Sequence, residues 1–338
     1  MLPYKPIQAF KIGDVISQLF LIANTNTRVA KNNKVYSVLT LKDKSGSLDV
    51  KIWDFDVNQY VDIASGSFIR LEIEIQDYKG QRSAVAKGAP MSMPSPTDLN
   101  PYESDLRLTA KQADECFASL MIFKNQVENI FIKTYLDVIF DDPATQELFK
   151  TAPASVSNRG AYFGGLSEHT LKVMLNAQGI IQAQLSAKDP VKIDRDIIIA
   201  GVLCHDLGKM YAYKVSPTGV HHTRSGLLLA HLPMSYGLSV QAFIRAEGVL
   251  RREIPEAIKD HINHCILAHH GTLEWGSPVK PQSVEARIVH VADMADGTTS
   301  CFAELARDNI DQVDENGFVP GSFFATKTVY VGNKGKDE

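Results

Sequence analysis

The first 90 residues carry their hydrophobic residues in short segments whose members alternate in part with polar positions. These segments are rich in β-branched and aromatic residues, which favours β-strands. They are Val15–Ile22, Val35–Leu41, Leu48–Trp53 and Phe68–Gln76, and turn-forming pairs such as Asn32-Asn33, Ser45-Gly46 and Lys79-Gly80 separate them. A five-stranded set of this size predicts a small Greek-key β-barrel of the OB type over residues 1–90.

After residue 108 the hydrophobic residues recur at spacings of three and four, which is typical of amphipathic helices. The first such pattern, from Thr109 to Leu136, predicts one helix of about thirty residues. Further helices are expected over 143–151, 166–186, 194–206, 233–250, 254–270 and 283–306. Tyr211–Arg224 predicts a short hairpin, and Gly321–Val331 has strand character. We therefore expect an all-α domain over residues 109–332, and the proline-rich stretch before it predicts a linker over 91–108.

Length and composition fit a two-domain globular protein of 338 residues, of which 44% are hydrophobic and 22% charged. The net charge of −4 gives no overall basic field, although residues 1–100 carry 12 Lys and Arg against 10 Asp and Glu. The longest apolar run, Ile197–Cys204, is too short to span a bilayer, and the N-terminus lacks the apolar core of a signal peptide. Four cysteines without a CxxC pair indicate reduced thiols. We expect a cytoplasmic protein that does not enter a membrane.

Histidine is confined to one part of the chain. All ten histidines lie between His169 and His290, inside the predicted helical domain. A separate evolutionary history of the two domains would explain this distribution, and so would a metal or acid–base site, because imidazole is the commonest transition-metal ligand. The spacing of the histidines distinguishes these explanations.

Four short segments place histidine or aspartate near the ends of predicted helices. They are Gly164–Thr170 (GGLSEHT), Gly201–Lys209 (GVLCHDLGK), Ile266–Gly271 (ILAHHG) and His290–Asp296 (HVADMAD). Burying the charged pair His205-Asp206 behind an apolar run costs free energy unless an opposite charge compensates it. A divalent cation would do so, with histidines of other helices as further ligands. The alternative is a set of separate core histidines, each with its own hydrogen bond, but the repetition at successive helix ends favours a metal site. Leu207-Gly208 is expected to form a helix C-cap.

The ordered motif of His169, His205-Asp206 and Asp293 resembles that of the HD superfamily of metal-dependent phosphohydrolases. One branch is more similar, the YhaM-type bacterial 3′→5′ exoribonucleases, in which an OB fold precedes the HD domain. The similar segments are Gly164–Thr170, His264–Gly271, Glu274–Pro278 and Glu285–Asp293, together with Leu39–Gly46 and Lys51–Asp54 in the barrel. The resemblance extends over about residues 10–330 and implies the fold class of a five-stranded OB-type β-barrel followed by an all-α HD domain.

Carried over by position, the resemblance implies two metal sites. His169, His205, Asp206 and Asp293 would hold one metal ion, and His231 and His269 would hold a second, with Asp206 bridging both and His270 as a further ligand. The family usually has glycine before the histidine at 231, where this chain has Ala230. His264 lies five residues before His269, about 140° around a helix, and is not expected to join them. Asp206 and Lys209 are the candidate catalytic residues, the lysine as a contact to a phosphate oxygen.

Two metal ions would activate water and neutralise the phosphoryl oxygens during phosphodiester hydrolysis. Mixed imidazole and carboxylate ligands suit Mn, Fe, Co, Ni or Zn better than Mg or Ca, and the resemblance favours Mn. Mg stays a less favoured alternative.

Aromatic and basic residues of the barrel predict a surface for single-stranded nucleic acid, because bases stack on aromatic rings while basic side chains contact phosphates. Half of these aromatic residues, Trp53 among them, are equally expected in the barrel core. Many relatives have histidines shortly before the GGL motif, where Arg159 of this chain could contact phosphate instead. The candidate contacts are Lys34, Tyr36, Trp53, Tyr78, Arg82 and Arg159.

These observations favour a metal-dependent 3′→5′ exoribonuclease that acts on single-stranded RNA, with single-stranded DNA as a second substrate to test. A hydrolase of small nucleotides and a non-catalytic nucleic-acid-binding protein are the alternatives. The intact set of ligand residues argues against the non-catalytic protein. The sequence leaves open whether the chain forms a homo-oligomer.

Overall fold

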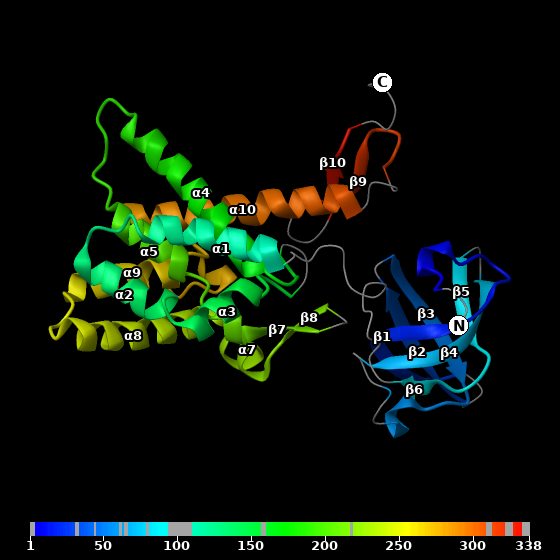
Figure 1. The fold of residues 1–338 in the computed structure, drawn as a ribbon. Coiled ribbons are helices and arrows are strands. Elements are labelled where there is room, and N and C mark those ends of the chain that lie inside the picture. The colour runs from blue at the N-terminus through cyan, green and yellow to red at the C-terminus, as the bar shows by residue number, and fades with distance from the viewer. Residues whose placement is uncertain are drawn as a thin grey trace. The chain divides into compact units, whose positions relative to one another are not determined.

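The computed structural model describes residues 4–30, 34–43, 45–60, 63, 67–78, 81–93, 110–156, 160–216, 219–308, 313–321 and 327–332. The chain forms two compact units. One comprises Met1–Leu106 with Ser216–Gly219, and the other comprises Arg107–Val215 with Val220–Glu338. Figure 1 shows the strands of the first unit in blue and cyan.

Five strands close into a barrel: β1 (Val15–Val29), β2 (Val35–Asp43), β3 (Gly46–Trp53), β4 (Phe68–Tyr78) and β5 (Gln81–Ala86). The order β1-β2-β3-β5-β4 returns to β1, with β3 and β5 parallel and the other pairs antiparallel. β1 serves both neighbours because residues 15–21 pair with β4 and residues 21–29 pair with β2, with a bulge at Ile22/Asn24 in the pairing with β2. The prediction of a five-stranded OB-type barrel is confirmed.

The barrel core follows the alternation of β-strands. On β2 and β3 the inward side chains of Leu39, Leu41, Val50 and Ile52 are each at most 3% exposed. Most neighbouring outward positions on the same strands face solvent or are half-buried, and Val38 is the buried exception among them. This alternation decides which aromatic residues of the barrel are available to a ligand.

A sixth strand departs from the prediction of a linker over 91–108. β6 (Met91–Met93) pairs antiparallel with Phe68–Arg70 of β4. These three residues lie between two prolines but contain none, so their backbone can join the ladder. The linker prediction is therefore wrong for 91–93, and residues 94–108 lie outside the described residues.

The second unit is helical, which confirms the predicted fold class. The described helices are α1 (Ala110–Lys124), α2 (Ile130–Phe140), α3 (Pro143–Thr151), α4 (Gly165–Leu185), α5 (Arg195–Cys204), α6 (Lys209–Ala212), α7 (Arg224–Leu229), α8 (His231–Leu250), α9 (Glu256–Ala268) and α10 (Val284–Asp308). Two hairpins accompany them, β7 (Tyr213–Ser216) with β8 (Gly219–His222) and β9 (Phe318–Pro320) with β10 (Thr328–Tyr330).

The predicted thirty-residue helix is instead two helices. α1 ends at Lys124, and Asn129 begins α2 by accepting hydrogen bonds from the backbone of Phe131 and Ile132. An asparagine side chain satisfies free amides at a helix start, so it competes with a continuous helix at this point. The apolar period continues across the break because both helices pack on the same core.

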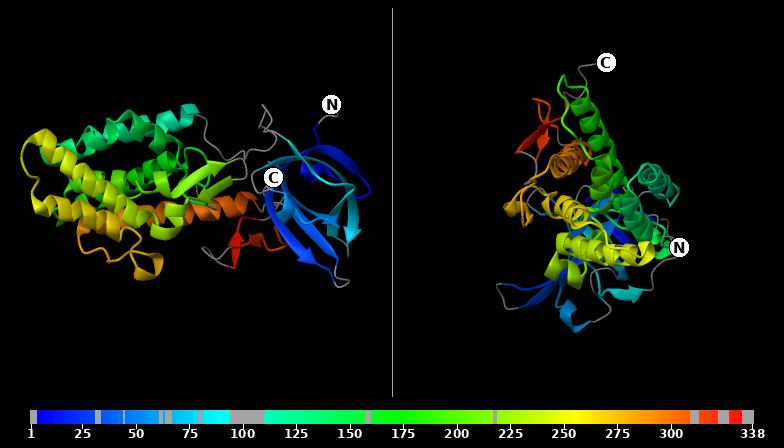
Figure 2. Two further views of the ribbon diagram at one scale, coloured as in Figure 1. Left: turned by 90° about the horizontal axis from the view of Figure 1, so that it is seen from below. Right: turned by 90° about the vertical axis from the view of Figure 1, so that its left-hand side faces the viewer.

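α5 forms the centre of the helical unit (Figures 1 and 2). Its apolar run from Ile197 to Cys204 is buried throughout, and the helix packs against α4, α9 and α10. A helix that is apolar on all sides must be buried on all sides, which explains why this run is the longest in the chain. The residues that follow α5 therefore emerge inside the helical unit.

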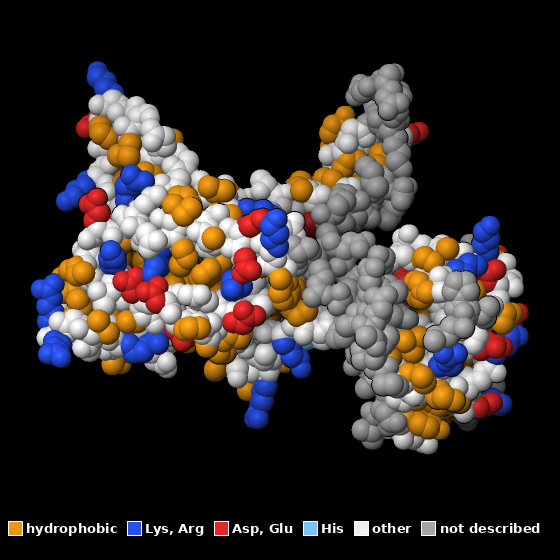
Figure 3. Space-filling view, viewed as in Figure 1, with side chains coloured by type: hydrophobic (Ala, Val, Ile, Leu, Met, Phe, Trp, Pro, Cys, Tyr) orange, Lys and Arg blue, Asp and Glu red, His pale blue; other side chains and the backbone are white. Residues whose placement is uncertain are grey.

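No helix in the described part of the chain combines the length and apolarity needed to cross a membrane. On the face shown in Figure 3, basic and acidic side chains are interspersed over the helical unit. The four cysteines form no disulfide bonds.

Candidate metal centre

The pair His205-Asp206 emerges from the buried end of α5. The backbone amide of His205 still bonds to the Gly201 carbonyl, so the pair continues the last turn of the helix. Gly201 allows the close approach of α9, because a Cβ there would lie 2.9 Å from Cβ of Cys265. His205 is 0% exposed and Asp206 is 2% exposed. The sequence therefore delivers an imidazole and a carboxylate into the core.

The predicted C-cap at Gly208 is wrong. Gly208 has a φ of −62°, which is ordinary helical backbone rather than the left-handed conformation of a glycine C-cap. Its lack of a side chain serves packing instead, since a Cβ would lie 2.2 Å from the His231 carbonyl oxygen. Gly208 thus brings the start of α8, and with it His231, next to Asp206.

Two other glycines place His169 near the start of α4, just after its first turn. Gly164 precedes the helix with a φ of 82°, a conformation that favours glycine. A Cβ on Gly165 would lie 2.1 Å from the Gly160 carbonyl oxygen, so this position also requires glycine. The GGLSEHT segment is thus a tight helix start that directs His169 toward Asp206.

One group of side chains gathers around Oδ2 of Asp206. The Nε2 atoms of His169 and His205 each lie 3.2 Å from this oxygen. His169 Nε2 lies 3.3 Å from His205 Nε2 and 3.3 Å from Asp293 Oδ1. Nitrogen and oxygen atoms from three helices therefore converge within the space of one metal ion.

A second group gathers around Oδ1 of the same carboxylate. His231 Nε2 lies 3.4 Å from this oxygen, and His269 Nε2 lies 3.6 Å from it. His270 Nε2 lies 3.3 Å from His231 Nε2 and completes a set of three imidazoles. Asp206 thus presents one oxygen to each group.

Most of these imidazoles are held by their other nitrogen. Nδ1 of His205 lies 2.7 Å from the Val202 carbonyl oxygen, and Nδ1 of His269 lies 2.6 Å from that of Ile266. Nδ1 of His270 lies 2.6 Å from the Trp275 carbonyl oxygen. A carbonyl can only accept, so each of these Nδ1 atoms carries the proton and each Nε2 presents a lone pair to the cluster.

The acceptors of the cluster have too few donors. Both oxygens of Asp206 and Nε2 of His269 are buried and accept no hydrogen bond from the described residues, although Lys209 Nζ forms an ion pair with Asp206 Oδ2 at 2.6 Å. Buried polar atoms in native proteins are nearly always satisfied. This deficit of donors, together with the inward Nε2 lone pairs, fits divalent cations at the centre.

Electrostatics keep the Asp206 carboxylate ionised and the imidazoles of the second group neutral. Burial opposes ionisation of Asp206, but the Lys209 ammonium holds its pKa well below the usual value. Burial lowers the pKa of His231 to about 3, and it also lowers the pKa values of His269 and His270. The imidazoles of the second group are therefore neutral near pH 7, which is the form that binds metals.

His169 behaves differently because carboxylates surround it. Burial disfavours its charged form, but Asp206, Asp293 and Asp296 outweigh burial and raise its pKa to about 10. The three carboxylates create a local excess of negative charge around this histidine. A divalent cation would neutralise the same charge and leave the imidazole as a neutral ligand.

The structure brings together all seven residues predicted as metal ligands and places Lys209 beside them, 12% exposed at its side chain. His264 lies apart, where its Nε2 accepts a hydrogen bond from the Gln282 amide. His221 is half-buried and His222 is exposed on β8, and Arg159 lies outside the described residues.

Sequence reasoning missed Asp296. Its Oδ2 lies 2.7 Å from Nδ1 of His169, so it holds this ligand as the carbonyl groups hold the others. The signal was present in the segment HVADMAD, where Asp296 follows Asp293 by three residues on α10 and so shares its helix face. His290 of the same segment is a support, because its Nδ1 bonds to the His269 carbonyl oxygen at 2.7 Å.

The barrel residues predicted to contact nucleic acid have different surroundings. Trp53 is 49% exposed, so its expected place in the core is wrong, because its position on β3 points outward. Its ring lies 4.9 Å from that of its cross-strand neighbour Tyr36, and exposed Lys34 pairs with Asp54 at 3.2 Å. Arg82 instead donates from Nη1 to the backbone carbonyls of the N-terminal turn at Ile7, Gln8 and Phe10. The Tyr78 side chain lies outside the described residues.

Comparison with known proteins agrees with this geometry. Residues 166–297 match the HD domain family. The 3′-5′ exoribonuclease YhaM of Bacillus velezensis is 27% identical over 293 residues, which are 86% of this chain and 88% of that protein. YhaM of Bacillus subtilis is 26% identical over 293 residues, and YhaM of Listeria welshimeri is 27% identical over 309 residues, or 90% of this chain and 91% of that protein. The chain is similar to these proteins over most of its length, which confirms the resemblance inferred from the motifs.

Proposed function

We propose that this HD-domain protein, similar to the YhaM exoribonucleases over most of its length, is a metal-dependent 3′→5′ exoribonuclease that hydrolyses single-stranded RNA. The carboxylate of Asp206 carries this proposal. Its two oxygens face two separate groups of histidine nitrogens, the arrangement expected of a residue that bridges two cations. The direction of degradation and the RNA substrate come from the names of the similar proteins.

The residues present fit two divalent cations. His169, His205, Asp206 and Asp293 would hold one, and the second would be held by Asp206 with His231, His269 and His270. Imidazole and carboxylate donors in this proportion suit Mn, Fe, Co, Ni or Zn better than Mg, and we propose Mn. The cations would lower the pKa of water and neutralise charge on the phosphoryl oxygens.

The protein's own groups complete the site. The Lys209 ammonium lies among the ligand residues but is a cation and so is no ligand itself. We assign it to a non-bridging phosphoryl oxygen, where a fixed positive charge stabilises the transition state more than the ground state. Asp296 holds the imidazole of His169 in place and is a positioning residue.

We assign RNA binding to the outer face of β1, β2 and β3. The strand registers place Arg28, Tyr36 and Trp53 side by side across this face, and Lys34 lies just before the start of β2. Two adjacent aromatic rings with basic neighbours suit the stacking of unpaired bases and contacts to phosphates. Arg82 is left out of this assignment because its guanidinium is engaged with the N-terminal turn.

A degradation assay tests the function. A 5′-labelled single-stranded RNA incubated with the protein and Mn²⁺ should give a ladder of successively shorter products, and a chelator should abolish it. The same RNA labelled at its 3′ end should release only a labelled mononucleotide. Hydrolysis of nucleotides without a ladder would instead identify a small-nucleotide hydrolase, and binding without hydrolysis a non-catalytic protein. A DNA oligomer of the same sequence tests the second substrate.

A further inference from the structure

Tyr213 stands at the edge of the metal centre although none of the motifs contains it. It is the first residue of β7, four positions after Lys209 and seven after Asp206. Its half-buried ring lies between β8 and the start of α8, with its centroid 5.1 Å from the ring of His222 and 6.4 Å from that of His231. The tyrosine therefore borders the second group of histidines.

The side chain of Tyr213 belongs to the same short segment as the charged pair of the centre, four residues after Lys209. Burial raises its pKa, and the Lys209 ammonium and the Asp206 carboxylate act on it in opposite directions. The phenol makes no hydrogen bond with any side chain or backbone group of the described residues. Tyr213 Oη is not among the buried polar atoms that lack a partner, so the hydroxyl is open to solvent and can donate to a ligand.

The backbone on both sides of the hairpin is fixed. The amide of Thr223 donates to the Ala212 carbonyl at 2.9 Å, and its hydroxyl donates to the Tyr211 carbonyl at 2.7 Å. Gly226 packs so closely that a Cβ would lie 2.1 Å from the Ala212 carbonyl oxygen. These contacts join the base of the hairpin to α7, so the position of Tyr213 is set before any ligand binds.

We infer that Tyr213 is a catalytic residue whose hydroxyl donates a hydrogen bond to a phosphoryl oxygen of the substrate, beside Lys209. This inference rests on the proposed phosphodiesterase function. The hydroxyl needs no proton transfer for this role, only a donor held in place where negative charge develops. Removal of one such fixed donor typically lowers turnover by about a hundredfold. His222 supports the outer edge of the ring and is a positioning residue.

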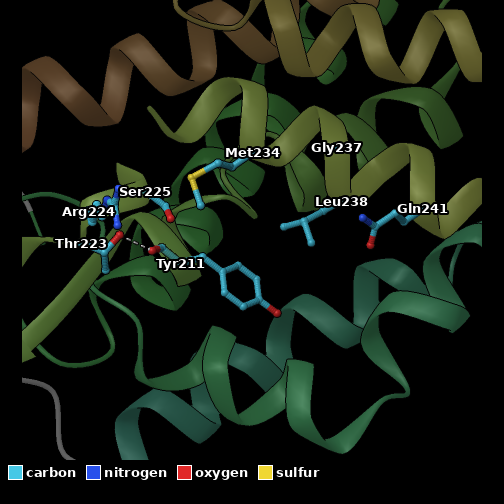
Figure 4. A pocket seen from close by; sticks show the side chains of 8 residues that line it. All are labelled: Tyr211, Thr223, Arg224, Ser225, Met234, Gly237, Leu238 and Gln241. Carbon is cyan, nitrogen blue, oxygen red and sulfur yellow. Dashed lines mark hydrogen bonds between the residues drawn. The ribbon is translucent and has the colours of Figure 1, made fainter. Parts of the chain in front are cut away.

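The test compares Tyr213→Phe with Tyr211→Phe. The first variant keeps the ring packed on His222 and His231 and removes only the hydroxyl. Tyr211 is 43% exposed and lines a separate surface hollow of about 570 Å³ with Met234, Leu238 and Gln241 (Figure 4). It is therefore a matched control that removes an equivalent hydroxyl two positions away.

Each variant is assayed with Mn²⁺ on single-stranded RNA and on bis(4-nitrophenyl) phosphate, a small chromogenic phosphodiester. We expect Tyr213→Phe to lower kcat by about 10- to 100-fold on both substrates. KM should change less than threefold, and bound metal and melting temperature should equal those of the wild type. Tyr211→Phe should retain the wild-type rate.

Two outcomes would overturn the inference while the function stands. One is an active wild type with a Tyr213→Phe rate within twofold of it, and the other is a rate loss that follows loss of bound metal. A wild type that hydrolyses neither substrate would overturn the proposed function, and the inference with it.

Discussion

Asp296 Oδ2 lies 2.7 Å from Nδ1 of His169, on the side of the imidazole opposite the cluster of histidine and aspartate side chains. The other oxygen of Asp296 accepts a hydrogen bond from Ser300 Oγ at 2.8 Å. Asp296 and Asp293, a proposed metal ligand, are one turn apart on α10. A single helix therefore supplies a carboxylate to the cluster and a second carboxylate that fixes the ring of His169, a proposed metal ligand.

Asp296→Asn should weaken metal binding at the first group of ligands. The amide keeps the shape of the carboxylate but loses the charge that makes the His169 imidazole a stronger donor. Removing such a support typically costs about 10- to 100-fold in metal affinity. The metal-free protein is titrated with Mn²⁺ while its activity is measured. The Mn²⁺ concentration that gives half of the maximal activity should be higher for the variant, and a high Mn²⁺ concentration should restore part of the rate. Ser300→Ala, which keeps the carboxylate, should shift the titration far less. If Asp296→Asn and the wild type gave the same Mn²⁺ titration curve, Asp296 would not support metal binding.

Asp206→Ala should abolish hydrolysis and reduce bound metal while the helical unit stays folded. The reason is that one carboxylate faces both groups of ligands, so its loss affects both cations. Metal analysis, circular dichroism and the RNA assay measure the three quantities. Asp189→Ala, on the exposed turn after α4, is the control. Substantial residual activity with a full metal complement would contradict the bridging role.

Lys209→Ala should lower turnover without loss of metal, because an ammonium group is no ligand. We expect a decrease of roughly a hundredfold in kcat from the loss of a fixed positive charge. The exposed Lys214 on β7 gives the control Lys214→Ala, which should retain the wild-type rate. An unchanged rate for Lys209→Ala would show that Lys209 does not stabilise the transition state and only forms the ion pair with Asp206.

Sequence reasoning found the cluster because its ligands lie in short motifs next to helices with clear apolar periods. His205-Asp206 follows the most apolar helix of the chain, so its burial could be inferred directly. The order of the motifs allowed residues as far apart as 169 and 293 to be assigned to one site, because the motifs occur in the same order in the superfamily that this chain resembles.

Two of the missed features, the place of Tyr213 and the contacts of Arg82, depend on contacts between residues distant in sequence, and a third is local. Tyr213 reaches the centre through a hairpin whose position is set by α7, and no period in the sequence encodes that contact. Arg82 is a basic residue next to a turn, and only the folded chain shows that it binds backbone carbonyls more than 70 positions away. The break before Asn129 was missed because capping acts locally while the apolar period continues across it.

Ala230→Gly should stabilise the protein. Ala230 has a φ of 60° and a ψ of 166°, a backbone conformation that glycine adopts without the strain that a side chain imposes. Relief of this strain outweighs the added flexibility of glycine in the unfolded chain, and we expect a gain of about 1 kcal/mol in the free energy of unfolding. Chemical denaturation measures it. Ala246→Gly, at a buried regular position of α8, should have the opposite sign. A destabilised Ala230→Gly protein would show that the conformation is not strained.

The outer face of β1, β2 and β3 can be tested through Trp53. Its ring is 49% exposed and packs beside Tyr36, so truncation removes a stacking surface at little cost to the barrel core. Stacking on an aromatic ring contributes about 1–3 kcal/mol per base, so Trp53→Ala should weaken single-stranded RNA binding by roughly 5- to 150-fold. Binding is measured by fluorescence anisotropy in an Asp206→Ala background, where the RNA stays intact.

Ile12→Ala is the control for Trp53→Ala. Ile12 is 59% exposed in the same unit, but it lies before the start of β1. Trp53 pairs with Tyr36, and Tyr36 pairs with Arg28 near the end of β1. Ile12 and Trp53 therefore lie near opposite ends of this strand. Ile12→Ala should therefore leave RNA affinity unchanged. With Asp206 intact, Trp53→Ala should hydrolyse bis(4-nitrophenyl) phosphate at the wild-type rate, because a small phosphodiester needs no stacking surface. Arg28→Ala should make the fall of log affinity with log salt concentration less steep, by about the amount that one phosphate contact contributes. If Trp53→Ala did not change the RNA affinity of the Asp206→Ala protein, the outer face of β1, β2 and β3 would be excluded as the binding surface.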